Sequence, residues 1–429
     1  MTNQPKEYGL ETRAIHAGSR PDATTGARNT PIYQTTSYVF DDVDHAADLF
    51  NLQTFGFIYS RLTNPTVSAL EERIANLEGG RAGVCCASGH SAQFLAFFSL
   101  LEPGDRFLAS KNLYGGSMTQ FGVSFKRLGW DVDFVDCTDL ETVKAAIKPE
   151  HKALFIEPLA NPGGVILDTQ ALADLAHENQ MVLIADNTMA TPYLFRPFEH
   201  GADIITHSAT KFLGGHGTSM GGAVIESGKF DWVKSGKYPA LVEADPAYHG
   251  LSFIETFGDF GFSMKTRCVG LRDFGPAMSP TNAFNLLTGI ETLHLRMERH
   301  VENAHKVATY LSQHPAVSWV SYAGLADSPY YDLAQKYFPK GPGSVFTFGV
   351  KGGFEAGVKV VENVNLISHL ANIGDTRSLI IHPASTTHRQ LSEEQQIASG
   401  AGPEVLRLSI GLETADDIIR DLDEALSLT

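Results

Sequence analysis

The lysine Lys211 follows an apolar run that ends in two small hydroxyl residues, Ser208 and Thr210, and it precedes a glycine-rich loop. A second apolar run, MVLIADN, contains Asp186 at its end. An amine can bind an aldehyde covalently, and a carboxylate can hold a proton on a ring nitrogen. An amine and a carboxylate presented by adjacent strand ends could therefore grip opposite ends of one planar heterocycle.

A third apolar run, AGVCCAS, leads into Ser88 and Gly89, where a helix is expected to begin. The free backbone N–H groups at the start of a helix bind anions such as phosphate. Each of these features is common by itself, but together they supply the amine, the carboxylate and the anion cradle that pyridoxal phosphate needs. We therefore predict this cofactor, with Lys211 as its Schiff-base lysine and Asp186 at its ring nitrogen.

Competing motifs fit the sequence less well. Lys211 precedes the glycines, whereas a P-loop places its lysine after them. Gly215 and Gly217 are followed by Met220 where a dinucleotide fingerprint requires a third glycine, which disfavours a nicotinamide-dependent oxidoreductase. The histidines form no H-E-x-x-H pair, so we predict no metal site.

The elements that must position these residues are strands alternating with helices. Short β-rich runs such as RFLAS, KALFIEP and ADIITHS are separated by amphipathic segments. This alternation predicts an α/β fold with a mostly parallel central sheet and helices on both faces. We expect an extended arm over 1–60, a cofactor-binding domain over 61–280 with an irregular aromatic insertion around 226–275, and a smaller α+β domain over 281–429. A long helix over 282–314 should join the two domains.

Composition restricts the partners and the compartment. The chain has 429 residues, a formal net charge of −16 and four cysteines without a C-x-x-C pair. An acidic surface repels phosphate backbones, so neither nucleic acid nor an anionic membrane is an expected partner. We expect reduced thiols and a cytoplasmic location, since the first residues carry no apolar signal segment.

Seven motifs, in order, resemble the Cys/Met-metabolism group of fold-type I pyridoxal phosphate enzymes over nearly the whole chain. These motifs are YSRLTNPT, ASGHSA, LYGGS, ADNTMATPY, SATKFLGGHG, IHPASTTH and LRLSIGLE. The resemblance implies a seven-stranded sheet and a homo-oligomer, expected to be a tetramer built from dimers with shared sites. It also implies which residues bind the cofactor: Lys211, Asp186, Tyr114, Ser88, Gly89, Ser208 and Thr210, together with Tyr59 and Arg61 from the neighbouring subunit. It further implies that Arg407, Asn161 and Ser378 bind the carboxylate of the substrate.

The aromatic insertion resembles that of the family's sulfhydrylases. It implies γ-replacement, in which O-acetyl-L-homoserine and sulfide, or a thiol, give L-homocysteine, or methionine, and acetate. Lys211 and Tyr114 would be the catalytic residues. The alternative is γ-elimination by a cystathionine or methionine lyase, and Gly116 counts against the latter because those lyases tend to have cysteine there. The sequence leaves open whether the leaving group is acetate or succinate. It also leaves open whether the sulfur donor is sulfide, a thiol or a protein-bound carrier, and what His90 does.

Overall fold

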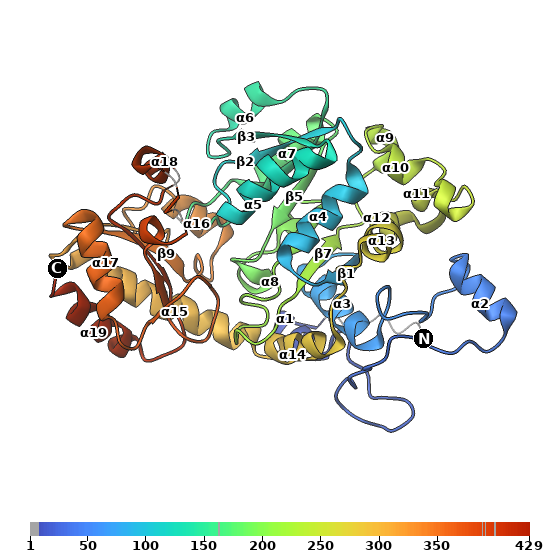
Figure 1. The fold of residues 1–429 in the computed structure, drawn as a ribbon, viewed down its shortest axis with the longest axis horizontal. Coiled ribbons are helices and arrows are strands. Elements are labelled where there is room, and N and C mark those ends of the chain that lie inside the picture. Colours follow the sequence, from blue (N-terminus) through green and yellow to red (C-terminus); the bar gives the residue numbers. More distant parts are fainter. Residues whose placement is uncertain (1–7, 162–163, 388, 391, 399) are drawn as a thin grey trace.

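The structure is a computed structural model that describes residues 8–429 except 162, 163, 388, 391 and 399. Two β-sheets, each with its own helices, form two lobes that lie side by side (Figure 1). The central lobe contains the larger sheet, and the C-terminal lobe contains the smaller one. The helix α15 (Leu293–Gln313) runs from the central lobe under the C-terminal sheet.

The central sheet has seven strands, as expected. All its neighbouring pairs are parallel except those of β7, which runs against both β1 and β6. Across the sheet the order is β1 (Ala82–Cys86), β7 (Gly222–Glu226), β6 (Ile204–His207), β5 (Val182–Asp186), β4 (His151–Ile156), β2 (Arg106–Ser110) and β3 (Asp131–Val135). The prediction of a mostly parallel sheet is confirmed.

Both faces of this sheet are buried, which explains why its inner strands are continuous apolar runs. In β5, Val182 and Ile184 face one hydrophobic core, and Leu183 and Ala185 face the other. The first core is packed by α4 (Gly89–Leu100), α10 (Pro239–Val242) and α12 (Gly261–Lys265). The second is packed by α1 (Leu10–His16), α3 (Pro65–Glu78), α6 (Leu140–Ala146), α7 (Thr169–Glu178), α8 (Thr191–Leu194) and α14 (Pro280–Glu291).

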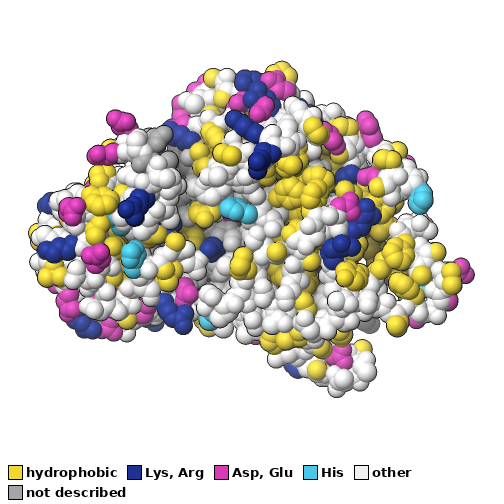
Figure 2. Space-filling model, viewed as in Figure 1, with side chains coloured by type: hydrophobic (Ala, Val, Ile, Leu, Met, Phe, Trp, Pro, Cys, Tyr) yellow, Lys and Arg dark blue, Asp and Glu magenta, His cyan; other side chains and the backbone are white. Residues whose placement is uncertain are grey.

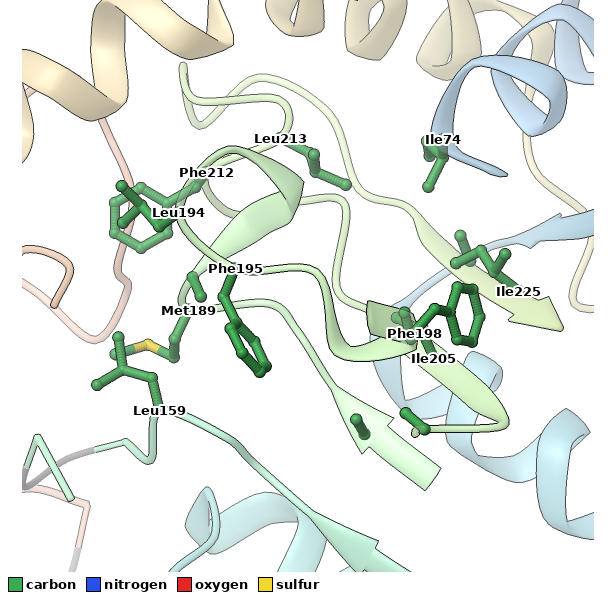
Figure 3. Packing of buried hydrophobic residues seen from close by; sticks show 14 of the residues in the cluster. Ile74, Leu159, Met189, Leu194, Phe195, Phe198, Ile205, Phe212, Leu213 and Ile225 are labelled. Carbon is green, nitrogen blue, oxygen red and sulfur yellow. The ribbon is translucent and has the colours of Figure 1, made fainter. Parts of the chain in front are cut away.

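The second core reaches the loop that carries Lys211. Phe212 and Leu213 are both buried in this core, and Figure 3 labels both among its side chains. Burying two large apolar side chains directly after the lysine stabilises the loop by about 3–6 kcal/mol. The backbone of Lys211 is therefore fixed by hydrophobic packing as well as by hydrogen bonds.

The C-terminal lobe has a five-stranded sheet. Its pairs are antiparallel except β10 with β11. The order is β10 (Ser368–His369), β11 (Leu379–Ile381), β12 (Val405–Ser409), β9 (Val345–Val350) and β8 (Val317–Ser321). Beyond α15, its helices are α17 (Gly353–Asn363), α18 (Glu393–Ala398) and α19 (Ala415–Leu426). The intervening helix α16 (Tyr331–Tyr337) buries Ala334 and Tyr337 in the second core of the central lobe. The smaller domain is α+β, as the sequence predicts.

Three expected segments differ in detail. The long helix over 282–314 is two helices, because the chain bends at Thr292 (φ −108°, ψ 13°) between α14 and α15. The insertion expected to be irregular contains three short helices that Gly or Pro starts or stops: α9 (Trp232–Ser235), α10 and α11 (Phe253–Phe257). They are followed by a continuous helical run in which α12, a π-helical turn (Thr266–Leu271) and α13 (Arg272–Phe274) join end to end. The arm contains α1 and α2 (Val43–Phe50), and its residues 1–7 lie outside the described residues.

Hydrophobic side chains are exposed over the arm and the short helices, on the right of the view in Figure 2. Val39 is 96% exposed, Val43 83% and Phe55 72%. Such a concentration of exposed apolar side chains marks an interaction surface. Across the described part of the chain, we find no helix with the length and hydropathy of a membrane span.

Candidate active site

Lys211 lies in the turn after β6, at the carboxyl end of the central sheet. Its backbone N–H donates to the carbonyl of Ser208 at 3.1 Å. The buried side chain of Arg296, on α15, donates to the carbonyls of Phe212 at 2.7 Å and Leu213 at 3.1 Å. Contacts on both sides of the lysine therefore hold the turn in place. Such restraint is required of a residue that must approach a ligand in one orientation.

The amine of Lys211 points toward the C-terminal lobe. Its Nζ donates to Oδ1 of Asn372 at 2.5 Å. Burial lowers the pKa of Lys211, and the charge of Arg407 lowers it further. Both effects raise the neutral fraction of the amine, which is the form that acts as nucleophile or base.

Asp186 ends β5, next to the strand that leads to Lys211. One of its carboxylate oxygens accepts hydrogen bonds from Thr206 Oγ1 at 3.0 Å and from Gln93 Nε2 at 3.2 Å. The other accepts the backbone N–H of Thr188 at 3.1 Å. The side chain is buried, so these bonds fix its orientation. A fixed, buried carboxylate of this kind suits the protonated nitrogen of a ring.

The start of α4 lies against the end of β6. Ser88 caps the helix, its Oγ accepting the backbone N–H of Ser91 at 3.2 Å. A Cβ on Gly89 would lie 2.7 Å from Cβ of Ser208, so only glycine allows this approach. The hydroxyl of Thr210 bonds to the backbone of Gly221, accepting from its N–H at 3.0 Å. The helix N-terminus and the Ser208 turn therefore form one cradle that suits a phosphate.

Tyr114 stands on another side of the site, and its ring lies 5.8 Å from that of His90. Its backbone N–H donates to Glu157 Oε1 at 2.8 Å, and the other oxygen of Glu157 accepts from the N–H of Asn161 at 3.1 Å. Burial, and then the charge of Asp186, raise the pKa of Glu157 to about 8. One buried carboxyl group thus joins the backbones of Tyr114 and Asn161.

Arg407, in β12, extends toward the central lobe. Its guanidinium donates to Asn161 Oδ1 at 3.4 Å and to the carbonyl of Asn372 at 3.3 Å. No carboxylate among residues 8–429, with the five gaps named above, forms a salt bridge with it. Burial lowers its pKa. A largely buried cation without a protein counter-ion is suited to bind an anion such as a substrate carboxylate.

Three of the predicted residues make other contacts. The hydroxyl of Ser378 donates to Glu413 Oε2 at 2.9 Å and accepts the N–H of Gly411 at 2.9 Å. Tyr59 lies at the end of the arm and Arg61 directly after it, and the guanidinium of Arg61 is 5.5 Å from the centre of the Tyr59 ring. Neither forms a described hydrogen bond or ion pair with the groups around Lys211. The structure therefore brings together the remaining predicted residues, which come from the start of α4, β5, the turn after β6, β12 and the two segments that carry Tyr114 and Asn161.

Sequence reasoning missed two residues that contact this group. Gln93 is buried on α4 and bonds to Asp186, and its signal is a lone amide within the apolar run SAQFLAFF. Asn372 bonds to Lys211 and Arg407 from a loop that follows β10. No motif in the sequence marks Asn372, because it contacts Lys211 from a segment that is far away along the chain.

The arrangement fits pyridoxal phosphate. A half-buried amine and a buried carboxylate come from neighbouring parallel strands, and a glycine-dependent cradle starts a helix beside them. Among the described residues, no group of three or more His, Cys, Asp or Glu side chains is placed to hold a metal ion.

The family model described as "Cys/Met metabolism PLP-dependent enzyme" matches residues 11–427. The chain therefore belongs to this family, and its cofactor is pyridoxal phosphate. It is 50% identical to O-acetyl-L-homoserine sulfhydrylase of Leptospira meyeri, over 99% of this chain and 98% of that one. It is 47% identical to homocysteine synthase of Schizosaccharomyces pombe, over 98% of each chain.

A crystal structure of a Campylobacter jejuni protein, assigned as an O-acetylhomoserine (thiol)-lyase, has the same fold. It superposes with a TM-score of 0.95 at 42% identity, covering 98% of this chain and all of that one. That structure contains an N'-pyridoxyl-lysine-5'-monophosphate.

Proposed function

We propose that this enzyme catalyses γ-replacement: O-acetyl-L-homoserine and sulfide give L-homocysteine and acetate, in methionine and cysteine biosynthesis. The observation that carries the proposal is the half-buried guanidinium of Arg407. It has no carboxylate partner in the described chain and lies beside an amine of lowered pKa. The relatives named as O-acetyl-L-homoserine sulfhydrylase and homocysteine synthase support this reaction over the full length.

The bound cofactor supplies an electron sink for charge that develops at the α-carbon. In our proposal Lys211 binds its aldehyde, Asp186 keeps a proton on its ring nitrogen, and Tyr114 stacks on its ring. Its phosphate lies in the cradle of Ser88, Gly89, Ser208 and Thr210. Arg407, Asn161 and Ser378 hold the α-carboxylate of the substrate.

Once the amine of the substrate has displaced it from the aldehyde, the freed amine of Lys211 removes the α-proton of the substrate and later a proton from Cβ. The Cγ–O bond then breaks, and acetate leaves with the bonding electron pair. Hydrosulfide forms the new Cγ–S bond, and Lys211 returns protons to Cβ and Cα. Tyr114 is the candidate acid or base for the leaving group and the entering sulfur, and such help is worth about 10²- to 10⁴-fold in rate.

We also propose that the working unit is a tetramer built from two dimers, in which Tyr59 and Arg61 of one chain reach the cofactor phosphate of its neighbour. The exposed apolar side chains of the arm support this arrangement. A cytoplasmic location agrees with four buried, free cysteines.

A product assay tests the reaction. O-Acetyl- and O-succinyl-L-homoserine are each supplied with sulfide, and homocysteine and 2-oxobutyrate are measured. We expect homocysteine from the acetyl ester, whereas 2-oxobutyrate as the main product would identify a γ-lyase. Lys211→Ala should lose both turnover and the covalent cofactor adduct that borohydride traps on the Lys211 peptide; an adduct on another lysine would refute its role.

A further inference from the structure

Asn372 contacts the two charged groups of the site through different atoms. Its side-chain oxygen accepts a hydrogen bond from Nζ of Lys211 at 2.5 Å. Its backbone carbonyl accepts one from the guanidinium of Arg407 at 3.3 Å. A single residue of the C-terminal lobe thus links the proposed base to the proposed ligand of the substrate carboxylate.

The segment that carries Asn372 is fixed on both sides. Gly374 (φ +72°) lies against the lysine turn, where a Cβ would be 2.7 Å from the backbone nitrogen of Phe212. The backbone N–H of Gly374 donates to Ser409 Oγ at 3.0 Å, which ties the segment to β12. The N–H of Thr376 donates to the carbonyl of Gly215 at 2.9 Å. The backbone of the segment that carries Asn372 is therefore held by packing and hydrogen bonds that do not involve Lys211 Nζ.

The chemical type of the acceptor matters for a base. A neutral amine that donates one N–H to an oxygen keeps its lone pair free for another direction. An amide oxygen is a strong hydrogen-bond acceptor but carries no charge and takes no proton at neutral pH. A carboxylate at the same place would favour the ammonium form and raise the pKa of the lysine. An amide can therefore orient the amine without protonating it.

We infer that Asn372 is a positioning residue that holds the freed amine of Lys211 toward the substrate α-carbon in its neutral form. The inference rests on the proposed role of Lys211 as base. It assigns to the C-terminal lobe a direct part in proton transfer, in addition to binding the substrate carboxylate.

The charged groups that face Lys211 are few. Arg407 approaches from β12 and lowers the pKa of the lysine. His90, on α4, interacts electrostatically with Lys211 and with Asp186, and partial desolvation lowers its pKa, which favours the neutral ring. Asp186 lies at the end of β5. Because the amide of Asn372 is neutral, no carboxylate at that position offsets the effect of Arg407, which lowers the pKa of Lys211.

The test uses two substitutions and a reaction that does not require γ-replacement. Exchange of the α-hydrogen of L-2-aminobutyrate with deuterium is followed by NMR in the holoenzyme across a range of pH. Asn372→Ala should slow exchange by about 10- to 100-fold because the amine loses its orientation. Asn372→Asp, which preserves the shape, should move the midpoint of the acid limb up by about one to three pH units.

A second readout does not depend on turnover. The rate at which the full-length apoenzyme captures pyridoxal phosphate on Lys211 is measured against pH by trapping with borohydride. Asn372→Asp should shift this midpoint upward as well, since a lysine held as ammonium is not a nucleophile. The control Asn363→Asp adds the same charge at the exposed end of α17 and should change neither midpoint.

Unshifted midpoints in Asn372→Asp, in folded protein with a wild-type circular dichroism spectrum, would overturn the inference. Wild-type exchange in Asn372→Ala would do the same. If the product assay instead identified a γ-lyase or another reaction, exchange and cofactor capture would still be measurable. The failure of the proposed function and the failure of this inference are thus distinguishable.

Discussion

Arg296 donates a hydrogen bond to the carbonyl of Phe212 at 2.7 Å, one residue beyond the cofactor lysine. The same guanidinium also reaches the carbonyls of Leu213 at 3.1 Å and Gly289 at 2.7 Å. It joins the lysine turn to the end of α14. Burial lowers the pKa of Arg296 to about 10, so the side chain remains a cation at neutral pH.

Arg296→Met should destabilise the protein by about 2–4 kcal/mol, because three main-chain carbonyls lose their donor in a buried place. Unfolding in urea measures the difference. The control Arg299→Met lies on the same helix with its side chain 53% exposed, and it should stay within about 0.5 kcal/mol of the wild type. Equal losses in the two variants would contradict the role given to Arg296.

Arg407→Lys should raise the KM for O-acetyl-L-homoserine by about 10- to 100-fold, with a smaller change in kcat. A lysine keeps the charge but cannot form the two parallel hydrogen bonds that a guanidinium makes with a carboxylate. Steady-state kinetics at fixed sulfide measures both constants. Arg377→Lys is the matched control, since that side chain is 67% exposed and paired with Asp375. An unchanged KM in Arg407→Lys would place the carboxylate site elsewhere.

Glu157 predicts a dependence of stability on pH. Its pKa rises from 4.5 to about 8 in the folded chain, so the folded state keeps a proton that the unfolded state has lost within this window. The unfolding free energy should therefore fall as pH rises through the window, by about 1.4 kcal/mol per pH unit at most. Glu157→Gln, measured by urea unfolding of the apoenzyme, should remove that part of the slope.

Glu226 provides a matched comparison. Burial raises its pKa to about 7, and its carboxylate accepts the backbone N–H of Ser263 at 2.7 Å. Glu226→Gln should flatten the slope only below about pH 7, whereas Glu157→Gln should also flatten it between about pH 7 and 8. Parallel curves for wild type and Glu157→Gln would show that the group titrates normally.

Shared sites predict complementation between inactive subunits. Lys211→Ala and Arg61→Ala should each be inactive or strongly impaired, but hybrids formed by refolding them together should regain about a quarter of the wild-type activity. Half of the randomly formed dimers are hybrids, and one of the two sites in each hybrid is intact. A mixture of Lys211→Ala with Asp186→Ala should stay inactive, because both groups belong to the same site. Sites that are complete within one chain would give no recovery from either mixture.

The sequence predicts those site residues that lie at the carboxyl ends of strands. Lys211 and Asp186 follow apolar runs of neighbouring parallel strands, and the carboxyl ends of such strands meet at one edge of the sheet. The α/β class and the mostly parallel sheet follow from the same alternation. Whether Tyr59, Arg61 and Ser378 have the roles that the family resemblance implies stays a prediction.

The groups that come from loops are not predictable in this way. Asn372 reaches Lys211 from 161 residues further along the chain, and no local pattern records such a contact. The break of the long helix at Thr292 is likewise invisible to periodicity, because the apolar spacing continues through it. The helices of the insertion are not predictable from periodicity either. Three of them, α9, α10 and α11, have only four or five residues each, and a π-helical turn interrupts the regular spacing between α12 and α13.

The long helix α15 makes contacts at both of the sites that a catalytic cycle must coordinate. Arg296 holds the lysine turn, and one turn later His300 bonds to the carbonyl of Ile410 at 2.6 Å, just after the strand of Arg407. A helix of this length behaves as one stiff rod on the timescale of side-chain motion. The two contacts lie one helical turn apart on the same helix, so a shift of this turn would move the lysine turn and the end of β12 together.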